Sequence, residues 1–189
     1  MRQKRYTVAL LAMLLVFPGC GGNDQSSEKA AKQPAATASV SSQIGEAQLL
    51  DPCRLILPAE AGEILGEAVK EGEYGEQQVV GMKKCFYESA AADSMKFLQI
   101  TVQQAEFMPE NVRAAGQSPQ SIFADTKEML AQGRIDLTGF GEEAFIGTGG
   151  LHMLAGGRYI TIGVGNPERD DNRKKLETAA RLVLEKLGR

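Results

Sequence analysis

LHMLAGGRYITIGV, residues 151–164, contains two alternating runs of apolar and polar side chains around Gly156-Gly157. A period of two is typical of a β-strand with one buried face. Two glycines between such runs predict a two-residue hairpin turn, because glycine tolerates the positive φ that these turns require. The resulting register pairs Met153 with Ile160 and Leu151 with Ile162 on one face, and His152 with Thr161 and Leu154 with Tyr159 on the other.

The segments before this hairpin predict further strands. Residues 97–102 alternate cleanly, with Leu98, Ile100 and Val102 on one face. Shorter runs at 77–80, 84–89, 134–138 and 144–146 also favour strands. Residues 105–119 contain two prolines and a glycine, which predict a loop.

Helices are expected on both sides of these strands and between them. Asp51-Pro52 predicts a helix start, because aspartate caps and proline suits the first helical position. Pro58 begins a second short helix, residues 121–132 form a third, and the last starts after Pro167 or at Asp170. The chain is therefore expected to adopt an α+β fold, a mainly antiparallel sheet packed with N-terminal, middle and C-terminal helices.

The N-terminus has the layout of a secretory signal peptide. Three basic residues, Arg2, Lys4 and Arg5, precede an apolar run at residues 8–17. A membrane-spanning helix needs roughly 20 apolar residues, so this run is too short to be a transmembrane anchor. A buried core helix is the other alternative, and the basic start argues against it.

Phe17-Pro18-Gly19-Cys20 resembles a bacterial lipobox. The resemblance implies a diacylglyceryl thioether on Cys20, cleavage before this residue and acylation of the new amino group. Gly21 follows the cysteine, and in a Gram-negative cell the resemblance implies the periplasmic side of the outer membrane. The alternative is ordinary cleavage that leaves a free thiol.

The chain is thus expected to divide into three parts. Residues 1–19 form the signal peptide, residues 20–46 the lipidated cysteine and a flexible tether, and residues 47–189 a single α+β domain. Loss of the three basic residues of the signal lowers the formal net charge from −3 to −6. An acidic protein lacks the basic surface that attracts nucleic acid or anionic lipid. The lipid on Cys20 is therefore expected to provide the membrane attachment.

Cys53 and Cys85 remain after Cys20 is lipidated. In an oxidising compartment they allow one intramolecular disulfide, and the alternatives are two buried thiols or a metal site. Zinc sites need closely spaced ligands, whereas His152 is the only histidine and no Cys-x-x-Cys motif is present. No metal or other cofactor is therefore expected.

Two short motifs carry a family resemblance. Asp51-Pro52-Cys53, the Leu65-Gly66 helix end and Cys85-Phe86-Tyr87 resemble the opening of a group of small bacterial lipoproteins of unknown function. Leu137-Thr138-Gly139-Phe140-Gly141-Glu142-Glu143-Ala144 is similar to their second motif, Gly-Leu-Gly-Asp-x-Ala. The resemblance implies a Cys53–Cys85 disulfide and a compact α+β domain of the PsbP-like kind, and it implies no activity.

Other motifs are better explained by structure than by chemistry. Residues 139–144 match the dinucleotide fingerprint G-x-G-x-x-A, but a strand rather than a helix is expected to follow, so we interpret the glycines as a turn. His152 is the one candidate for a neutral-pH base, and no partnered nucleophile or orienting acid is evident. The glutamates near Glu60, Glu63 and Glu67 are interpreted as a solvated surface rather than a calcium site.

One sheet face remains as a candidate partner surface. Alternation assigns to it Phe97, His152, Leu154 and Tyr159, and an exposed apolar patch is typical of an interaction site. We therefore expect a non-catalytic binding module that contacts an envelope protein or a small apolar ligand, and no enzyme activity. The alternatives are a small envelope hydrolase that uses His152 or paired glutamates, and a purely structural envelope lipoprotein.

Overall fold

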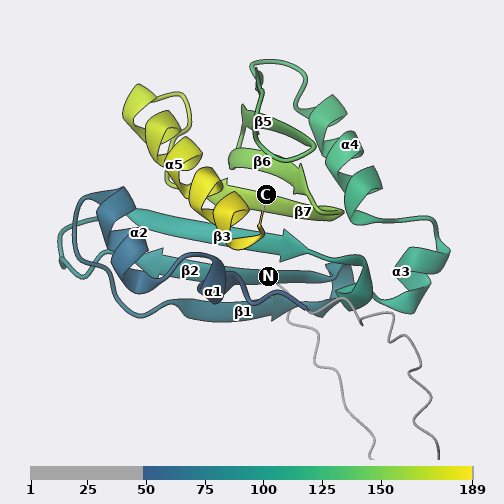
Figure 1. Cartoon of the computed structure of the whole chain (residues 1–189), viewed down its shortest axis with the longest axis horizontal. Coiled ribbons are helices and arrows are strands. Elements are labelled where there is room, and N and C mark those ends of the chain that lie inside the picture. The colour runs from purple at the N-terminus through teal and green to yellow at the C-terminus, as the bar shows by residue number, and fades with distance from the viewer. Residues whose placement is uncertain (1–48, 189) are drawn as a thin grey trace, which may run out of the picture. The chain divides into compact units, whose positions relative to one another are not determined.

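The computed structural model describes residues 49–188, which all lie within one compact unit. The expected signal peptide, Cys20 and the tether lie outside the described residues. The described strands form a seven-stranded antiparallel sheet in the order β1-β2-β3-β7-β6-β5-β4 (Figure 1). The strands are β1 (Glu73–Gln77), β2 (Met82–Glu88), β3 (Phe97–Gln103), β4 (Ile135–Leu137), β5 (Glu143–Gly147), β6 (Gly150–Ala155) and β7 (Arg158–Gly163). Together with helices before, within and after the sheet, this arrangement confirms the expected α+β fold.

The β6–β7 hairpin has the register predicted from its alternating residues. Met153 lies opposite Ile160, and His152 lies opposite Thr161. Gly156 and Gly157 turn the chain with φ of 60° and 72°, a conformation that side chains with a Cβ rarely adopt. The turn therefore sets the register, and the register decides which side chains lie on each face.

The pairing of β3 with β7 joins the N-terminal strands to the C-terminal ones. Ile100 lies opposite Ile162, and Val102 lies opposite Ile160. These four side chains are almost completely buried. The predicted apolar face of residues 97–102 is thus confirmed, and it continues across the seam into β7.

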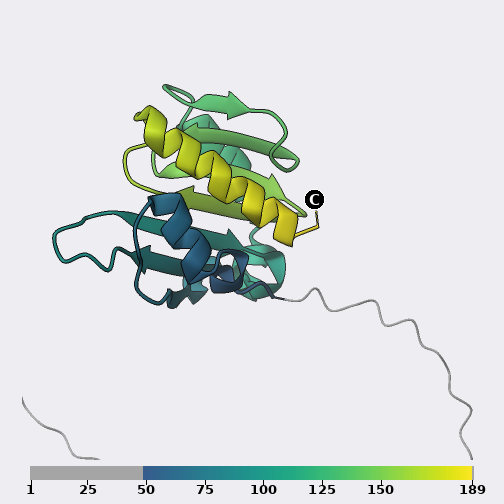
Figure 2. The ribbon, with the colours of Figure 1, turned by 60° about the vertical axis from the view of Figure 1, so that its left-hand side comes forward.

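Three helices cover this apolar face: α1 (Pro52–Leu55), α2 (Pro58–Leu65) and α5 (Asp170–Lys186). In Figure 2, α2 and α5 lie side by side in front of the sheet. The apolar stripe of α5 is buried because Leu176, Ala180 and Val183 recur at helical spacing. These helices and the sheet together enclose the main hydrophobic core.

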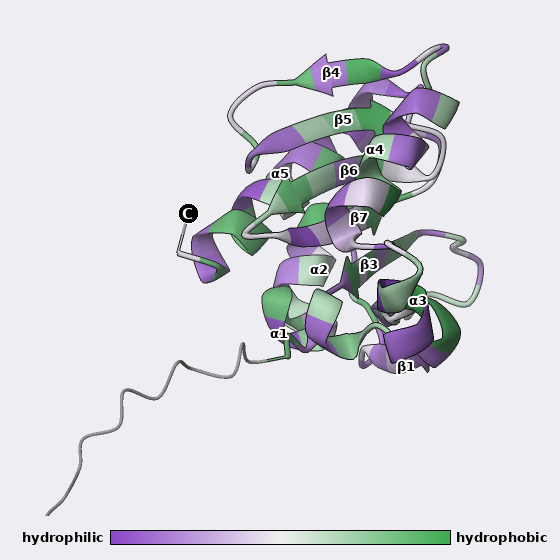
Figure 3. Ribbon diagram, turned by 90° about the vertical axis from the view of Figure 1, so that its right-hand side faces the viewer, coloured by the Kyte–Doolittle hydropathy of each residue, from purple (hydrophilic) through white to green (hydrophobic). Residues whose placement is uncertain are grey.

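One helix, α4 (Pro119–Met129), packs on the opposite face against β6 and β7. Figure 3 shows α4 and α5 on opposite sides of the sheet. Ser118 caps α4 by accepting a hydrogen bond from the backbone of Ser121 at 3.0 Å. Phe123 of α4 packs on Phe145 and Tyr159, which form a second, smaller core.

Two predictions about the strands and loops need correction. Residues 77–80 are not one strand, because β1 ends at Gln77 and Gln78–Val80 form a 3-10 helix, η1. Gly81 ends η1 with φ of 63° and lies against Met108, which turns the chain sharply into β2. The apolar pair Val79 and Val80 suggested a strand, but both side chains are exposed.

The segment 105–119 is also more regular than the predicted loop. It contains a 3-10 helix, η2 (Ala105–Phe107), and a short helix, α3 (Glu110–Ala114). Pro109 occupies the N-cap position of α3. The N–H at this position makes no hydrogen bond within the helix, so proline, which lacks it, is tolerated there. Proline therefore precedes a helix here instead of excluding one.

The glycine motif at residues 139–144 forms the turn between β4 and β5. Gly139 and Gly141 have φ of 81° and 64°, and Glu142 donates its backbone N–H to Leu154 O at 2.8 Å. β5 follows directly, and no helix begins there. A Cβ on Gly141 would lie 2.3 Å from Leu154 O, whereas a Cβ on Gly139 would meet nothing within 4 Å.

These two glycines make a matched test of the turn. Gly139→Ala is expected to cost about 1–2 kcal/mol, the strain of a left-handed backbone alone. Gly141→Ala is expected to cost a further 1–3 kcal/mol or so, because the added methyl group displaces the β6 backbone. Urea unfolding followed by circular dichroism measures both, and equal losses for the two variants would contradict the close approach at Gly141.

Candidate functional site

Cys53 and Cys85 form a disulfide with a Cα–Cα separation of 5.1 Å, which confirms the expected bridge. Asp51 starts α1 because its carboxylate accepts a hydrogen bond from Cys53 N at 2.9 Å, and Pro52 occupies the first turn. Cys85 is fully buried on β2. Asp51-Pro52-Cys53 therefore begins a one-turn helix and fastens it to the sheet.

Tyr87 completes this junction; it was quoted within the Cys85-Phe86-Tyr87 motif but given no role of its own. Its hydroxyl donates to Ile56 O and lies 3.3 Å from Cys53 O. Burial raises the pKa of Tyr87 to about 12, and the nearby Asp51 charge contributes. The residue spacing could have identified Tyr87 as part of this junction. It lies two residues after Cys85, and residues two apart point to the same face of a strand.

His152 is a buried structural residue between the sheet and α4. Its Nε2 lies 3.0 Å from Thr148 O, and its Nδ1 lies 2.7 Å from the Tyr159 hydroxyl. A carbonyl only accepts, so Nε2 carries the proton and Nδ1 accepts from Tyr159. The ring also stacks on Phe145, with centroids 4.7 Å apart. Both nitrogens are thus held by structural partners.

The environment of His152 favours the neutral ring. Burial lowers its pKa below the usual 6.5, and the hydrogen bond to Thr148 opposes this shift only in part. Charging the ring would require Nδ1 to donate, so Tyr159 would have to reverse its hydroxyl. The arrangement holds α4, β7 and the β5–β6 turn together rather than presenting a base to substrate.

The predicted partner face is largely covered, and this expectation is corrected. His152 and Tyr159 are each 6% exposed beneath α4, and Leu154 packs partly buried beside the same cluster. Alternation assigned these side chains to one face correctly, but it gave no information about the helix that covers that face. Three of the four predicted residues are therefore core residues or line the core.

Phe97 differs from the other three residues of that face. It lies on β3, whereas α4 packs mainly on β6 and β7, and it keeps part of its surface exposed. Its ring stacks on Phe86 of β2, with centroids 5.6 Å apart and planes at 25°. The structure thus adds Phe86 to Phe97 as a partly exposed aromatic pair.

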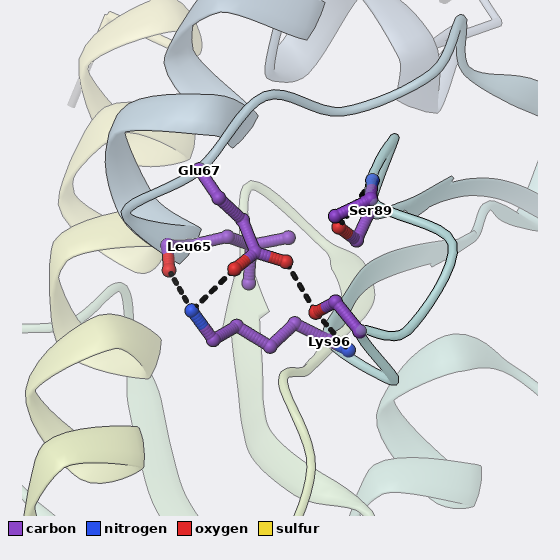
Figure 4. Close-up of polar contacts among 6 residues, drawn as sticks. Leu65, Glu67, Ser89 and Lys96 are labelled. Carbon is purple, nitrogen blue, oxygen red and sulfur yellow. Dashed lines mark hydrogen bonds and ion pairs between the residues drawn. The ribbon is translucent and has the colours of Figure 1, made fainter.

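The glutamate-rich segment forms ion pairs that join elements. Glu67 follows α2 and binds Lys96 Nζ at 2.6 Å, and it also accepts a hydrogen bond from Ser94 (Figure 4). Hydrogen bonds from Lys96 and from serines lower the pKa of Glu67 to about 2. Lys96 also lies 3.4 Å from Leu65 O. This network fastens the β2–β3 connection to the end of α2.

The other glutamates do not converge with Glu67 on a cation site. Glu60 lies 2.8 Å from Lys186 of α5, so its charge is paired across the helices. Within residues 49–188, no group of three His, Cys, Asp or Glu side chains is placed to hold a metal ion.

The glycine-rich turn at Gly147–Gly149 borders a cavity of about 370 Å³. Its other walls come from the segments around Gly133 and Pro167. The residues that line it include Glu168 and no lysine or arginine. A phosphate group would therefore find no cation among the residues that line this cavity.

Comparison of the chain with protein-family models, with curated proteins and with solved structures finds no match in any of the three. Among the residues that the structure describes, no helix is both long enough and apolar enough to cross a bilayer.

The disulfide is expected to contribute strongly to stability. Replacing both cysteines, Cys53→Ala with Cys85→Ala, is expected to lower the free energy of unfolding by about 2–5 kcal/mol, because the bridge restricts the unfolded chain. Chemical denaturation of the variant and the oxidised wild type measures this difference. Two reactive thiols in denatured protein isolated without reductant would show that the bridge is absent in the native protein.

His152 is expected to make stability depend on pH below its usual pKa of 6.5. Its folded pKa lies below 6.5, so the unfolded chain binds more protons and the free energy of unfolding falls as pH drops below 6.5. His152→Gln should remove this slope, whatever its effect at pH 7.5. Denaturation midpoints at several pH values provide the measurement. Since His152 is the only histidine, an unchanged slope in the variant would refute the assignment.

Proposed function

We propose that this protein is an exported lipoprotein, anchored by lipid on Cys20, whose domain acts as a non-catalytic binding module outside the cytoplasm. The observation that carries the proposal is the Cys53–Cys85 disulfide. Structural disulfides persist in oxidising compartments and are rare in the cytosol of most cells. The bridge therefore supports the export that the N-terminal sequence predicts.

The anchor is inferred from the residues that end the apolar run. Pro18-Gly19-Cys20 follows a basic start and ten apolar residues, Val8 to Phe17. A single acyl chain binds a membrane only marginally, so stable anchoring needs two or more. A diacylglyceryl group with an additional acyl chain on the amino group meets that requirement.

A binding role is favoured over catalysis by the environment of the one histidine. Both nitrogens of His152 are engaged by Tyr159 and Thr148, and the ring is buried. The aromatic pair Phe86 and Phe97, in contrast, keeps exposed surface on the sheet. Aromatic side chains contribute large apolar area at protein interfaces, so we place the partner contact at this pair.

The anchor has a direct test. Cys20→Ser is expected to leave the protein unprocessed or soluble, because the sulfur that accepts the lipid is missing. Partitioning of cell extracts between detergent and aqueous phases measures the change, with Ser27→Ala as a control that keeps Cys20. Mature-size Cys20→Ser protein in the detergent phase would contradict lipidation at this residue.

The binding role is tested by photo-crosslinking in intact cells. A benzoylphenylalanine at position 97 is expected to capture a discrete partner or ligand, while the same group at exposed Glu128 on α4 should not. Phe86→Ala should weaken the adduct, because it removes the ring on which Phe97 packs. Equal labelling at the two positions would favour a purely structural lipoprotein.

A further inference from the structure

The strand β4 forms one of the two edges of the sheet, and its outer side is open. Within residues 49–188 no strand lies beyond it, and Figure 3 shows it as the outermost strand. Its first residue, Ile135, is 41% exposed. This side chain borders two cavities, of about 370 and 300 Å³, which the start of α5 and the segment before it also line. The helices of the chain therefore leave the space around Ile135 unfilled.

The pairing of β4 with β5 decides which backbone groups of β4 are free. Gly147 ends β5 at a two-residue turn, and the residue pair that closes such a turn is hydrogen-bonded. Backbone groups alternate in direction along a strand, so Ile146 points its N–H and C=O away from β6 and toward β4. Ile146 lies opposite Ile135. The neighbours of Ile135, Arg134 and Asp136, therefore turn their N–H and C=O groups toward the free edge.

The side chains at this edge carry opposite charges that lie close together. Arg134 Nε lies 2.8 Å from Asp136 Oδ1, and Arg134 also donates to Lys127 O at the end of α4. The side chain of Asp136 remains 59% exposed. Lys127 in turn pairs with Glu143 of β5. Two positive and two negative charges therefore cancel here, and a second copy of the edge would meet no net repulsion.

Antiparallel pairing of two β4 strands about Ile135 matches these groups. It places Arg134 of each copy opposite Asp136 of the other, and the outward backbone groups of both residues exchange hydrogen bonds. Ile135 then meets Ile135 of the second copy on the other face of the sheet. A register centred on Asp136 would instead oppose two aspartates, and like charges directly opposite each other are destabilising.

We propose that two copies of this chain associate through β4, paired antiparallel about Ile135. The other edge strand, β1, offers no such match, because it carries Glu73 and Glu76 and no basic residue of its own. The β4 contact is short, since the strand has three residues, so the association is weak and needs a high local concentration. The inference goes beyond the proposed binding role and does not depend on the lipid at Cys20.

Disulfide trapping in intact cells tests the register. In the proposed pairing the Cα atoms of residue 135 in the two copies lie about 4.5 Å apart, a separation that a disulfide can span. Ile135→Cys is expected to give an oxidised dimer on a non-reducing gel, several-fold more than Thr138→Cys. Thr138 is exposed just after the same strand, but its two copies would lie about 20 Å apart. The wild-type chain is the blank for links through Cys20.

A charge exchange tests the pairing of Arg134 with Asp136. In the Ile135→Cys protein, Asp136→Arg should reduce the dimer several-fold, because it puts a positive charge opposite Arg134 of the second copy. Adding Arg134→Asp should restore the dimer. Circular dichroism of each purified variant checks that the domain is folded.

Four results would overturn the proposal. They are equal dimer from Ile135→Cys and Thr138→Cys, a dimer that Asp136→Arg leaves unchanged, a loss that Arg134→Asp does not reverse in folded protein, and a link from position 135 to a different protein only. The last result would assign the β4 edge to a strand of another partner.

Discussion

The pairing of β3 with β7 is the interaction on which the rest of this domain depends. It brings Ile100 against Ile162 and makes one sheet from strands that lie in separate halves of the chain. On the apolar face, α2 contacts β3 and α5 contacts β7, and the two helices contact each other across the seam. On the other face, Thr101 and Thr161 hydrogen-bond through their hydroxyls. Separating β3 from β7 would therefore divide both the core and the layer of helices.

Each half of the sheet is fastened to a helix by a different kind of contact. In the N-terminal half, the disulfide and Tyr87 hold α1 to β2. In the C-terminal half, Phe123 of α4 packs on Tyr159, whose hydroxyl binds His152. The first contact is covalent and independent of pH in the physiological range. The second depends on a neutral imidazole, so acid weakens one side of the domain before the other.

The sequence predicted those features that depend on local patterns. The β6–β7 register followed from Gly156-Gly157, and the buried face of β3 followed from alternation. The η1 turn was missed because Val79 and Val80 have strand-like side chains, and nothing local shows that Met108 fills the space behind Gly81. Helix α3 was missed because Pro109 resembles a breaker when its neighbours are unknown.

The candidate site was less predictable, because exposure is a tertiary property. Alternation placed His152 and Tyr159 on the same face as Phe97, and that assignment of faces is consistent with the observed register. It did not show that α4 packs on β6 and β7 and covers those side chains. The disulfide was expected from a resemblance in the residues around Cys53 and Cys85. Tyr87 belonged to the same motif, but only its spacing from Cys85 indicated that it lies on the same face of the strand.

The order of the strands along the chain has a consequence for how the domain is assembled. Cys53 and Cys85 are 32 residues apart, whereas Thr101 and Thr161 across the central seam are 60 apart. In a chain that emerges from its N-terminus, Cys53 and Cys85 are both present while residues 158–163 are still to come. Throughout that interval β3 has an unpaired edge, the kind of surface on which strands of other chains add. A strand that is interior in the finished sheet thus has an open edge until β7 is available.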